Sequence, residues 1–366
     1  MKIVNNTLTN FTIDYPIEKL AAPEHILFID IETTGFTARS AGLYLIGCAY
    51  YESSQWHIIQ WLAQSKEEEK DLLEAFFTFA SRFTCLIHYN GNNFDLPFLE
   101  QKCAYYELPY NFKQYRGIDL YRRISPYKTF LHLENCKQKT IESFLDIKRD
   151  DTFTGGELIG IYNSYLSEKG DFEEKTLLLH NFDDVKGMLS LVSMLAYYDM
   201  LNEGVVAKKV QANYYVDFDG VKNQELLMHV ILPSKLPKPI TGCACGCYFS
   251  GNGKEGIIKV PIFEGELKYF YANYKDYYYL PSEDIALHKS VAGFVDKEHR
   301  EQATASTCYT RKSSVYLPEW EPLVKPFFKK DYKGSGMFFE LLDEIKRDRK
   351  LFADYASHII QVIAMK

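Results

Sequence analysis

The sequence lacks the features of membrane-spanning, secreted and disulfide-stabilised proteins. No apolar run in its 366 residues approaches the length of a membrane span. Residues 1–20 show neither the charged start nor the hydrophobic stretch of a signal peptide. The eight cysteines are scattered except for one cluster, which favours free thiols in a reducing compartment over a disulfide framework. We therefore expect a cytoplasmic protein that makes no membrane contact.

Positive charge is also scarce. The chain holds 42 Lys and Arg against 49 Asp and Glu, a net charge of −7. Residues 1–202 carry 19 basic against 28 acidic side chains, a balance of −9, whereas residues 203–366 carry 23 against 21, a balance of +2. A globally basic chain would point more directly to nucleic acid. This division nevertheless suits a metal site beside a surface that contacts a polyanion.

The composition that is present is that of an ordinary globular protein, long enough for two domains with sizeable cores. We predict a leader segment at 1–22, a first domain at 23–202 and a β-rich domain at 203–366. Strands over 26–31, 43–51, 55–62 and 85–89, with helices over 66–83, 97–105, 140–145, 158–165 and 173–201, predict a mixed sheet flanked by helices in the first domain. In the second we predict strands over 211–218 and 226–232, a helix over 282–295 and an amphipathic helix between 337 and the C-terminus.

The first candidate site is the end of the apolar run at 26–31, where Asp30 and Glu32 stand. Residues two apart on a strand share a face, so both carboxylates project to one side near the strand's carboxyl end. Thr33, Thr34 and Gly35 then end the strand. Adjacent carboxylates repel each other and are costly to bury without a cation between them. A divalent metal is the simplest answer, and the alternative is a strand end that has reached solvent.

Two further acidic motifs lie later in the first domain. Asp95 follows a turn at residues 90–93, where the fourth strand gives way to a helix, and the plain alternative is a turn-and-cap aspartate. His180 and Asp184 lie four apart on the long predicted helix and therefore on one face, an arrangement that surface helices often carry. In combination the three motifs supply four acids and a base, which are suitable oxygen ligands for two hard cations beside a phosphate.

These motifs carry a family resemblance. DIETTG, NGNNFD and HNFDDV resemble the three exonuclease motifs of the DEDD superfamily, which has the ribonuclease H-like fold. More narrowly, residues 24–200 resemble the YprB-like ribonuclease-H-like domain family, with matches at 117–120, 150–151, 155–157 and the Asn181-x-x-Asp184-Val185 pattern. The resemblance covers about the first half of the chain. It implies an α/β fold of the ribonuclease H-like class, followed here by a β-rich α+β domain with a terminal helix.

The resemblance also implies site residues. Asp30 and Glu32 match the pair of the first motif, Asp95 the acid of the second and Asp184 the acid of the third. Helical geometry alone leaves Asp183 as a rival, but the family's pattern places the ligand just before Val185. His180 stands four residues before Asp184, where the Tyr-type branch has a tyrosine, whereas the His-type branch places its histidine five before. This sequence is thus a hybrid of the two branches.

The activity implied is a metal-dependent 3′–5′ exonuclease that acts on single-stranded DNA or RNA with two divalent cations, Mg²⁺ or Mn²⁺. Asp30, Glu32, Asp95 and Asp184 would hold the cations, and His180 would orient or deprotonate the attacking water. Thr33, Asn90 and Asn93 are the candidate substrate contacts, and for Asp119 we favour a structural role over an orienting one. The alternatives are a catalytically inactive nucleic-acid-binding protein and a scaffold on the same fold.

The second half resembles no family. Cys243, Cys245 and Cys247 alternate, which would place all three on one strand face, and we favour packing over a zinc site completed by Cys308 or a His. The tyrosine-rich run at 269–279 is either a base-stacking platform or, as we favour, the core and edge of a β-rich domain. The basic segment formed by Arg311, Lys312, Lys325, Lys329, Lys330 and Lys333 fits phosphate contact or a solvated face.

Overall fold

The computed structural model describes residues 1–216 and 218–366, and the chain divides into two compact units. The first consists of Met1–Asp199 with Ser234–Lys238, and the second of Met200–Pro233 with Pro239–Lys366. In the described ranges, no helix combines the length and the apolar character that crossing a bilayer requires.

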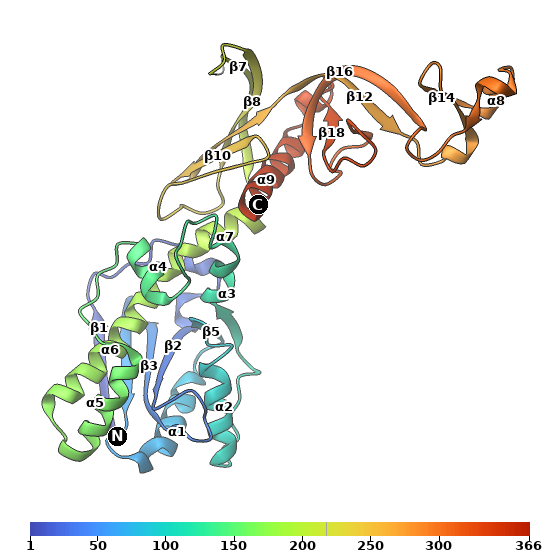
Figure 1. Ribbon diagram of the computed structural model, residues 1–366. Coiled ribbons are helices and arrows are strands. Elements are labelled where there is room, and N and C mark those ends of the chain that lie inside the picture. Colours follow the sequence, from blue (N-terminus) through green and yellow to red (C-terminus); the bar gives the residue numbers. More distant parts are fainter. Residues whose placement is uncertain (217) are drawn as a thin grey trace. The chain divides into compact units, whose positions relative to one another are not determined.

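The first unit is built on a six-stranded mixed sheet (Figure 1). Its strands run in the order β1-β4-β3-β2-β5-β6 and comprise β1 Lys2–Leu8, β2 Ile26–Thr33, β3 Leu43–Glu52, β4 Gln55–Leu62, β5 Cys85–His88 and β6 Arg116–Asp119. The central strand β2 pairs antiparallel with β3 and parallel with β5. The near-continuous apolar sequences of β2 and β3 follow from this position, because both faces of a central strand are covered.

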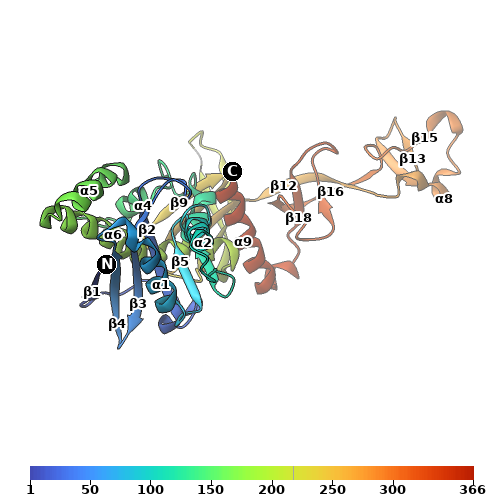
Figure 2. The same ribbon diagram turned by 90° about the horizontal axis from the view of Figure 1, so that it is seen from below.

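Helices flank this sheet on both faces (Figures 1 and 2). They are α1 Glu69–Ala80, α2 Asp95–Tyr105, α3 Leu120–Ile124, α4 Gln138–Phe144, α5 Gly155–Glu168, α6 Asp171–Leu191 and α7 Leu195–Asn202. Buried Leu72, Leu73, Phe76 and Phe77 form the apolar stripe of α1 that packs into the core beside β3 and β4. The mixed sheet flanked by helices confirms the predicted fold class.

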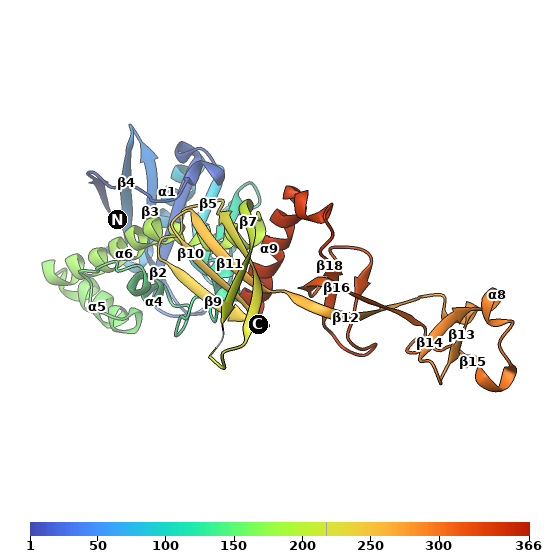
Figure 3. The same ribbon diagram turned by 90° about the horizontal axis from the view of Figure 1, so that it is seen from above.

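The second unit is built from antiparallel sheets and a terminal helix, as predicted. Its sheets follow the orders β7-β8-β11-β10-β9, β12-β16-β18-β17 and β14-β13-β15. The strands are β7 Val206–Val216, β8 Lys222–Ile231, β9 Ile240–Ala244, β10 Cys247–Asn252, β11 Glu255–Pro261, β12 Phe263–Phe270, β13 Tyr277–Leu280, β14 Ile285–His288, β15 Glu301–Gln302, β16 Tyr309–Glu319, β17 Phe327–Phe328 and β18 Met337–Glu340. The helices are α8 Lys289–Ala292 and α9 Arg349–Met365, and α9 lies across the five-stranded sheet (Figure 3).

Several local predictions were wrong. Residues 2–8 of the predicted leader form β1, which pairs with β4 at the sheet edge, and they lack a clear apolar period because only Leu8 is fully buried. The helix predicted over 282–295 is mostly the strand β14 and the four-residue α8, because Asp284 adopts a left-handed φ of 53° and turns the chain back onto β13. The predicted helix at 173–201 is interrupted by a 3₁₀ turn at Val192–Met194.

The cysteine cluster also departs from its prediction. The three residues do not share a strand face, because Cys245 and Gly246 form a tight turn with φ values of 53° and 78° between β9 and β10. Cys247 is buried, whereas Cys243 and Cys245 are exposed. In the basic segment, Arg311 pairs with Asp284 and Lys312 with Glu340, so two of its charges are engaged within the unit. Residue 217, part of the strand predicted over 211–218, lies outside the described residues.

Candidate metal centre

The central strand β2 brings Asp30 and Glu32 to the face that α6 covers. Ile26 to Ile29 are fully buried, and beyond them Asp30 and Glu32 are half-buried while the intervening Ile31 points into the core. The pairing with β3 shifts register between Glu32 and Thr33, so the regular strand ends there. The two carboxylates therefore lie side by side at the carboxyl end of a rigid strand.

Asp95 joins this pair from the start of α2. Its Oδ1 accepts a hydrogen bond of 3.3 Å from the backbone N–H of Ile31, the residue between Asp30 and Glu32. Asp95 is 6% exposed. A cap or turn aspartate would face its own helix, whereas this carboxylate is bonded to the strand that carries the other two acids.

The helix α6 is docked against the sheet by Asn181. Its Nδ2 donates to Asp30 Oδ2 at 2.9 Å, and its Oδ1 accepts from Gln60 Nε2 at 2.9 Å. Asp30, Gly47 and Gln60 are paired across β2, β3 and β4, so the asparagine spans three strands above Gly47. This arrangement fixes the rotation of α6 and thereby the positions of its next residues.

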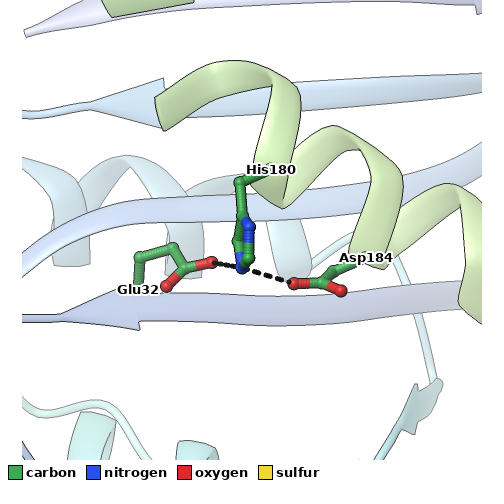
Figure 4. A group of neighbouring side chains, drawn as sticks. All are labelled: Glu32, His180 and Asp184. Atoms are coloured by element: carbon green, nitrogen blue, oxygen red, sulfur yellow. Dashed lines mark ion pairs between the residues drawn. The ribbon is translucent and has the colours of Figure 1, made fainter. Parts of the chain in front are cut away.

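One turn of α6 carries the remaining site residues. Nε2 of His180 lies 3.2 Å from Asp184 Oδ2 and 3.6 Å from Glu32 Oε1 (Figure 4). These three ligand atoms all lie within 4.8 Å of one another. The four-residue spacing of His180 and Asp184 therefore places them on one face, as predicted, and that face is turned toward β2.

The neighbouring Asp183 does something different. Its Oδ2 accepts hydrogen bonds of 2.8 Å from the backbone N–H groups of both Asp150 and Asp151. Asp183 therefore holds a loop against α6, and it is Asp184 that reaches the acidic cluster.

The loop held by Asp183 supplies two residues that the sequence did not single out for the site. Asp151 Oδ2 lies 2.8 Å from His180 Nδ1, and Arg149 Nη1 lies 2.7 Å from Asp184 Oδ1. Arg149 also pairs with Glu142 at 2.9 Å. The charged run at 148–151 was the available signal, but nothing in its spacing indicates which members turn inward.

Burial and mutual repulsion dominate the electrostatics of the four acids. Burial raises the pKa of Asp30 well above its usual range, and the charges of Asp184, Glu32 and Asp95 raise it further. Burial likewise raises the pKa of Glu32 to about 8, against the opposing influence of His180, and that of Asp95 to about 7. Carboxylates so placed need protons or cations between them. Oxygen donors together with an imidazole fit a divalent cation, and Glu32, His180 and Asp184 are grouped closely enough to hold one.

The α6 pair is tuned in the opposite sense. Burial lowers the pKa of His180, but the hydrogen bond and charge of Asp184, with the charges of Glu32 and Asp151, raise it above its ordinary value. Burial raises the pKa of Asp184, yet His180 and Arg149 together bring it below the ordinary value. Asp184 is therefore the member of the cluster held most firmly as a carboxylate.

The predicted substrate contacts are engaged in local structure. Thr33 donates through Oγ1 to the carbonyl of Gly35 at 2.8 Å. Asn93 Nδ2 donates to Asn90 Oδ1 at 2.7 Å, which closes the turn before α2. Asp119 accepts from the backbone N–H of Asn90 at 2.9 Å, and so supports that turn as the favoured structural interpretation expected.

Comparison with known proteins gives a family for the first unit. Residues 27–196 match the family model RNase_H_2, described as the RNase_H superfamily. Among solved structures, the family B DNA polymerase from the hyperthermophilic archaeon Pyrobaculum calidifontis is 13% identical with a TM-score of 0.38, over 69% of this chain and 35% of the polymerase. E. coli exonuclease I in complex with a dT13 oligonucleotide is 10% identical with a TM-score of 0.32, over 56% of this chain and 54% of that one.

These structural likenesses are weak, and they carry no argument about what this chain does. The chain spans about a third of the matched polymerase and about half of exonuclease I. No curated protein matches the sequence.

Proposed function

Residues 27–196 belong to the RNase H superfamily, and we propose that this unit is a metal-dependent exonuclease that hydrolyses single-stranded DNA or RNA from the 3′ end. The observation that carries the proposal is the convergence of Asp30, Glu32, Asp95 and Asp184, from β2, α2 and α6, around the imidazole of His180. The direction of hydrolysis rests on the resemblance of the three motifs to DEDD exonucleases.

In this proposal Asp30, Glu32, Asp95 and Asp184 hold two divalent cations, Mg²⁺ or Mn²⁺. When bound there, such cations activate water and stabilise the attacking and leaving oxygens of a phosphodiester. Asn181 keeps Asp30 oriented, Asp95 is fixed to the backbone of Ile31, and Asp151 sets the rotation of the His180 ring. Rigid supports of this kind hold reacting groups in place before the substrate arrives.

An exposed aromatic ring beside the acids supports a single-stranded substrate. Phe36, four residues after Glu32, is 93% exposed, and its ring centre lies 6.2 Å from that of Phe94, the residue before Asp95. An aromatic side chain left in water is costly unless it has a use, and stacking an unpaired base on it is worth roughly 1–3 kcal/mol. A base-paired strand could not offer a base in this way.

Cations line a cavity that begins just after the acidic strand. A cavity of about 510 Å³ is bordered by Thr34, Arg39, Lys66 and Lys102 together with Glu69. Its lining is positive although residues 1–202 as a whole are acidic. A phosphodiester strand entering the site would find its complement there. We assign the backbone-contacting roles of Thr33, Asn90 and Asn93 to the same path.

The ion pair between Arg149 and Asp184 favours a second candidate function. A guanidinium that neutralises one of four ligand carboxylates would weaken cation binding, which suits a protein that binds nucleic acid without cleaving it. The ion pair occupies Oδ1 only, and Oδ2 still faces His180. The exonuclease therefore remains the leading proposal.

The two candidates separate in one assay. Single-stranded oligonucleotides labelled at the 5′ or the 3′ end are incubated with the full chain and Mn²⁺ or Mg²⁺. We expect progressive shortening from the 3′ end, reduced roughly a hundredfold or more in Asp30→Asn and unchanged in Asp71→Asn, a matched exposed aspartate on α1. Salt-sensitive binding without shortening would establish the binding protein instead, and neither result would leave the scaffold.

A further inference from the structure

The imidazole of His180 is held rigidly from its Nδ1 side. Nδ1 lies 2.8 Å from Asp151 Oδ2, and the backbone N–H of Asp151 donates to Asp183 at 2.8 Å. Lys139 adds an ion pair to the same Asp151 oxygen at 3.3 Å. His180 is 5% exposed, so the ring has little freedom to turn. Its Nε2 therefore stays directed at Glu32 and Asp184 (Figure 4).

The tautomer follows from the partner at Nδ1. A carboxylate accepts hydrogen bonds, so Nδ1 carries the hydrogen, and a neutral ring then presents the Nε2 lone pair. That lone pair faces Glu32 Oε1 and Asp184 Oδ2, two more acceptors. Three acceptors directed at one point repel each other unless something positive lies between them.

The separations suit a metal ion at that point. Two ligand atoms that each lie about 2.1 Å from one ion are about 3.0 Å apart at a right angle and about 3.4 Å apart at a tetrahedral angle. Nε2 lies 3.2 Å from Asp184 Oδ2 and 3.6 Å from Glu32 Oε1. Only small side-chain movements would bring all three atoms into the coordination sphere of one ion.

We propose that His180 is itself a ligand of the cation through Nε2, with Glu32 and Asp184, and that Asp151 is the positioning residue that aims it. This assignment rests on the proposed function in that it takes the same site to bind a divalent cation. It replaces the water-activating role that the sequence predicts for His180. A carboxylate that accepts from the far nitrogen of a metal-bound imidazole is a common way to fix ring and tautomer.

The assignment has a consequence for metal choice. Mg²⁺ binds oxygen ligands and rarely nitrogen, whereas imidazole is a good ligand for transition metals such as Mn²⁺, Co²⁺ and Zn²⁺. The centre should therefore prefer Mn²⁺ over Mg²⁺ by more than an all-carboxylate site would, and most of that preference should depend on His180.

The test is pulsed electron paramagnetic resonance of Mn²⁺ bound to the full chain. We expect a ¹⁴N coupling from a directly bound imidazole, which changes to the ¹⁵N pattern when the protein is labelled at histidine. His180→Gln should abolish the coupling and lower Mn²⁺ affinity about tenfold or more, with a smaller effect on Mg²⁺. His25→Gln, an exposed histidine, is the matched control and should change neither.

The outcomes separate the two levels of the argument. Mn²⁺ that binds, is lost in Glu32→Gln, and shows no nitrogen coupling would overturn the role of His180 and leave the metal-dependent nuclease standing. Failure of the wild-type chain to bind Mn²⁺ at all would overturn both. The labelled wild-type spectrum needs no substitution, so a variant that folds poorly cannot obscure the result.

Discussion

At the scale of single residues, Gly47 shows how closely the site and the sheet are fitted together. A Cβ built on Gly47 would lie 1.9 Å from Oδ1 of Asn181, whose amide holds Asp30. No side chain other than hydrogen fits there while Asn181 keeps its place. The glycine is thus part of the support for the first carboxylate, although it lies on a different strand.

Gly47→Ala should therefore displace Asn181 and disturb Asp30. We expect the free energy of unfolding to fall by roughly 1–3 kcal/mol, the usual range for overpacking, and the Mn²⁺ affinity to fall with it. Urea titration and calorimetric Mn²⁺ binding measure the two effects. Gly160→Ala is the control, because that exposed helical position has open space around its Cβ and should gain about 0.5–1 kcal/mol. Equal stability of Gly47→Ala and wild type would refute the close fit.

Glu319, in the second unit, makes stability depend on pH. It is fully buried on β16, and its Oε2 accepts from the backbone N–H groups of Leu323 and Val324 at 3.0 and 3.2 Å. Within the described residues its other oxygen has no hydrogen-bond partner. Burial raises the pKa of Glu319 to about 7. The folded state therefore keeps a proton that the unfolded chain releases above its ordinary value of 4.5.

The sign follows from that difference. The stabilisation is fully present below pH 4.5 and is lost as the pH rises through 7, by up to about 3 kcal/mol. Glu319→Gln keeps an acceptor for both N–H groups and cannot ionise, so its second unit should lose less stability between pH 5 and pH 8. Hydrogen exchange of the β16 amides at both pH values measures this. The same pH dependence in both proteins would show that Glu319 is not its source.

At the scale of elements, α6 carries two adjacent aspartates with separate tasks. Successive helical residues point about 100° apart, so Asp183 faces the loop backbone at 150–151 while Asp184 faces β2. The division of labour follows from helix geometry once the docking of α6 is known.

The two tasks predict two phenotypes. Asp183→Ala leaves two backbone N–H groups without their acceptor and should cost roughly 2–3 kcal/mol of unfolding free energy in EDTA. Asp184→Ala should cost less stability, because Arg149 keeps its pair with Glu142, but should lose most of the Mn²⁺ affinity. Denaturant titration and Mn²⁺ calorimetry on both variants decide the matter, and an exchange of the two phenotypes would reverse the assignment.

The elements that the sequence predicted well are those whose burial repeats regularly. β2, β3 and α1 show an apolar pattern that covers a whole element, and the acids of β2 interrupt it. β1 was missed because an edge strand buries few side chains, and β14 because a single left-handed residue reverses the chain. Arg149 and Asp151 were missed as site residues because a loop has no period, and their direction depends on a distant hydrogen bond from Asp183.

At the scale of the whole molecule, every residue of the candidate centre belongs to the first unit. The second unit has its own buried core, in which Phe249, Ile258, Tyr355 and Ile359 are fully buried between the five-stranded sheet and α9. A chain with two such cores need not unfold in a single step. A ligand that binds only one unit stabilises that unit by mass action.

Mn²⁺ should therefore act on one thermal transition and not on another. At a free concentration of 100 times the dissociation constant, binding adds about 2.7 kcal/mol to the first unit, which corresponds to a rise of roughly 5–10 °C in its Tm for about 200 residues. Differential scanning calorimetry with Mn²⁺ and with EDTA should show one transition that moves and one that stays. Asp30→Asn should abolish the shift, while Glu319→Gln should leave it intact and alter only the other transition at pH 8. A single transition that responds to both substitutions would show that the two units unfold as one.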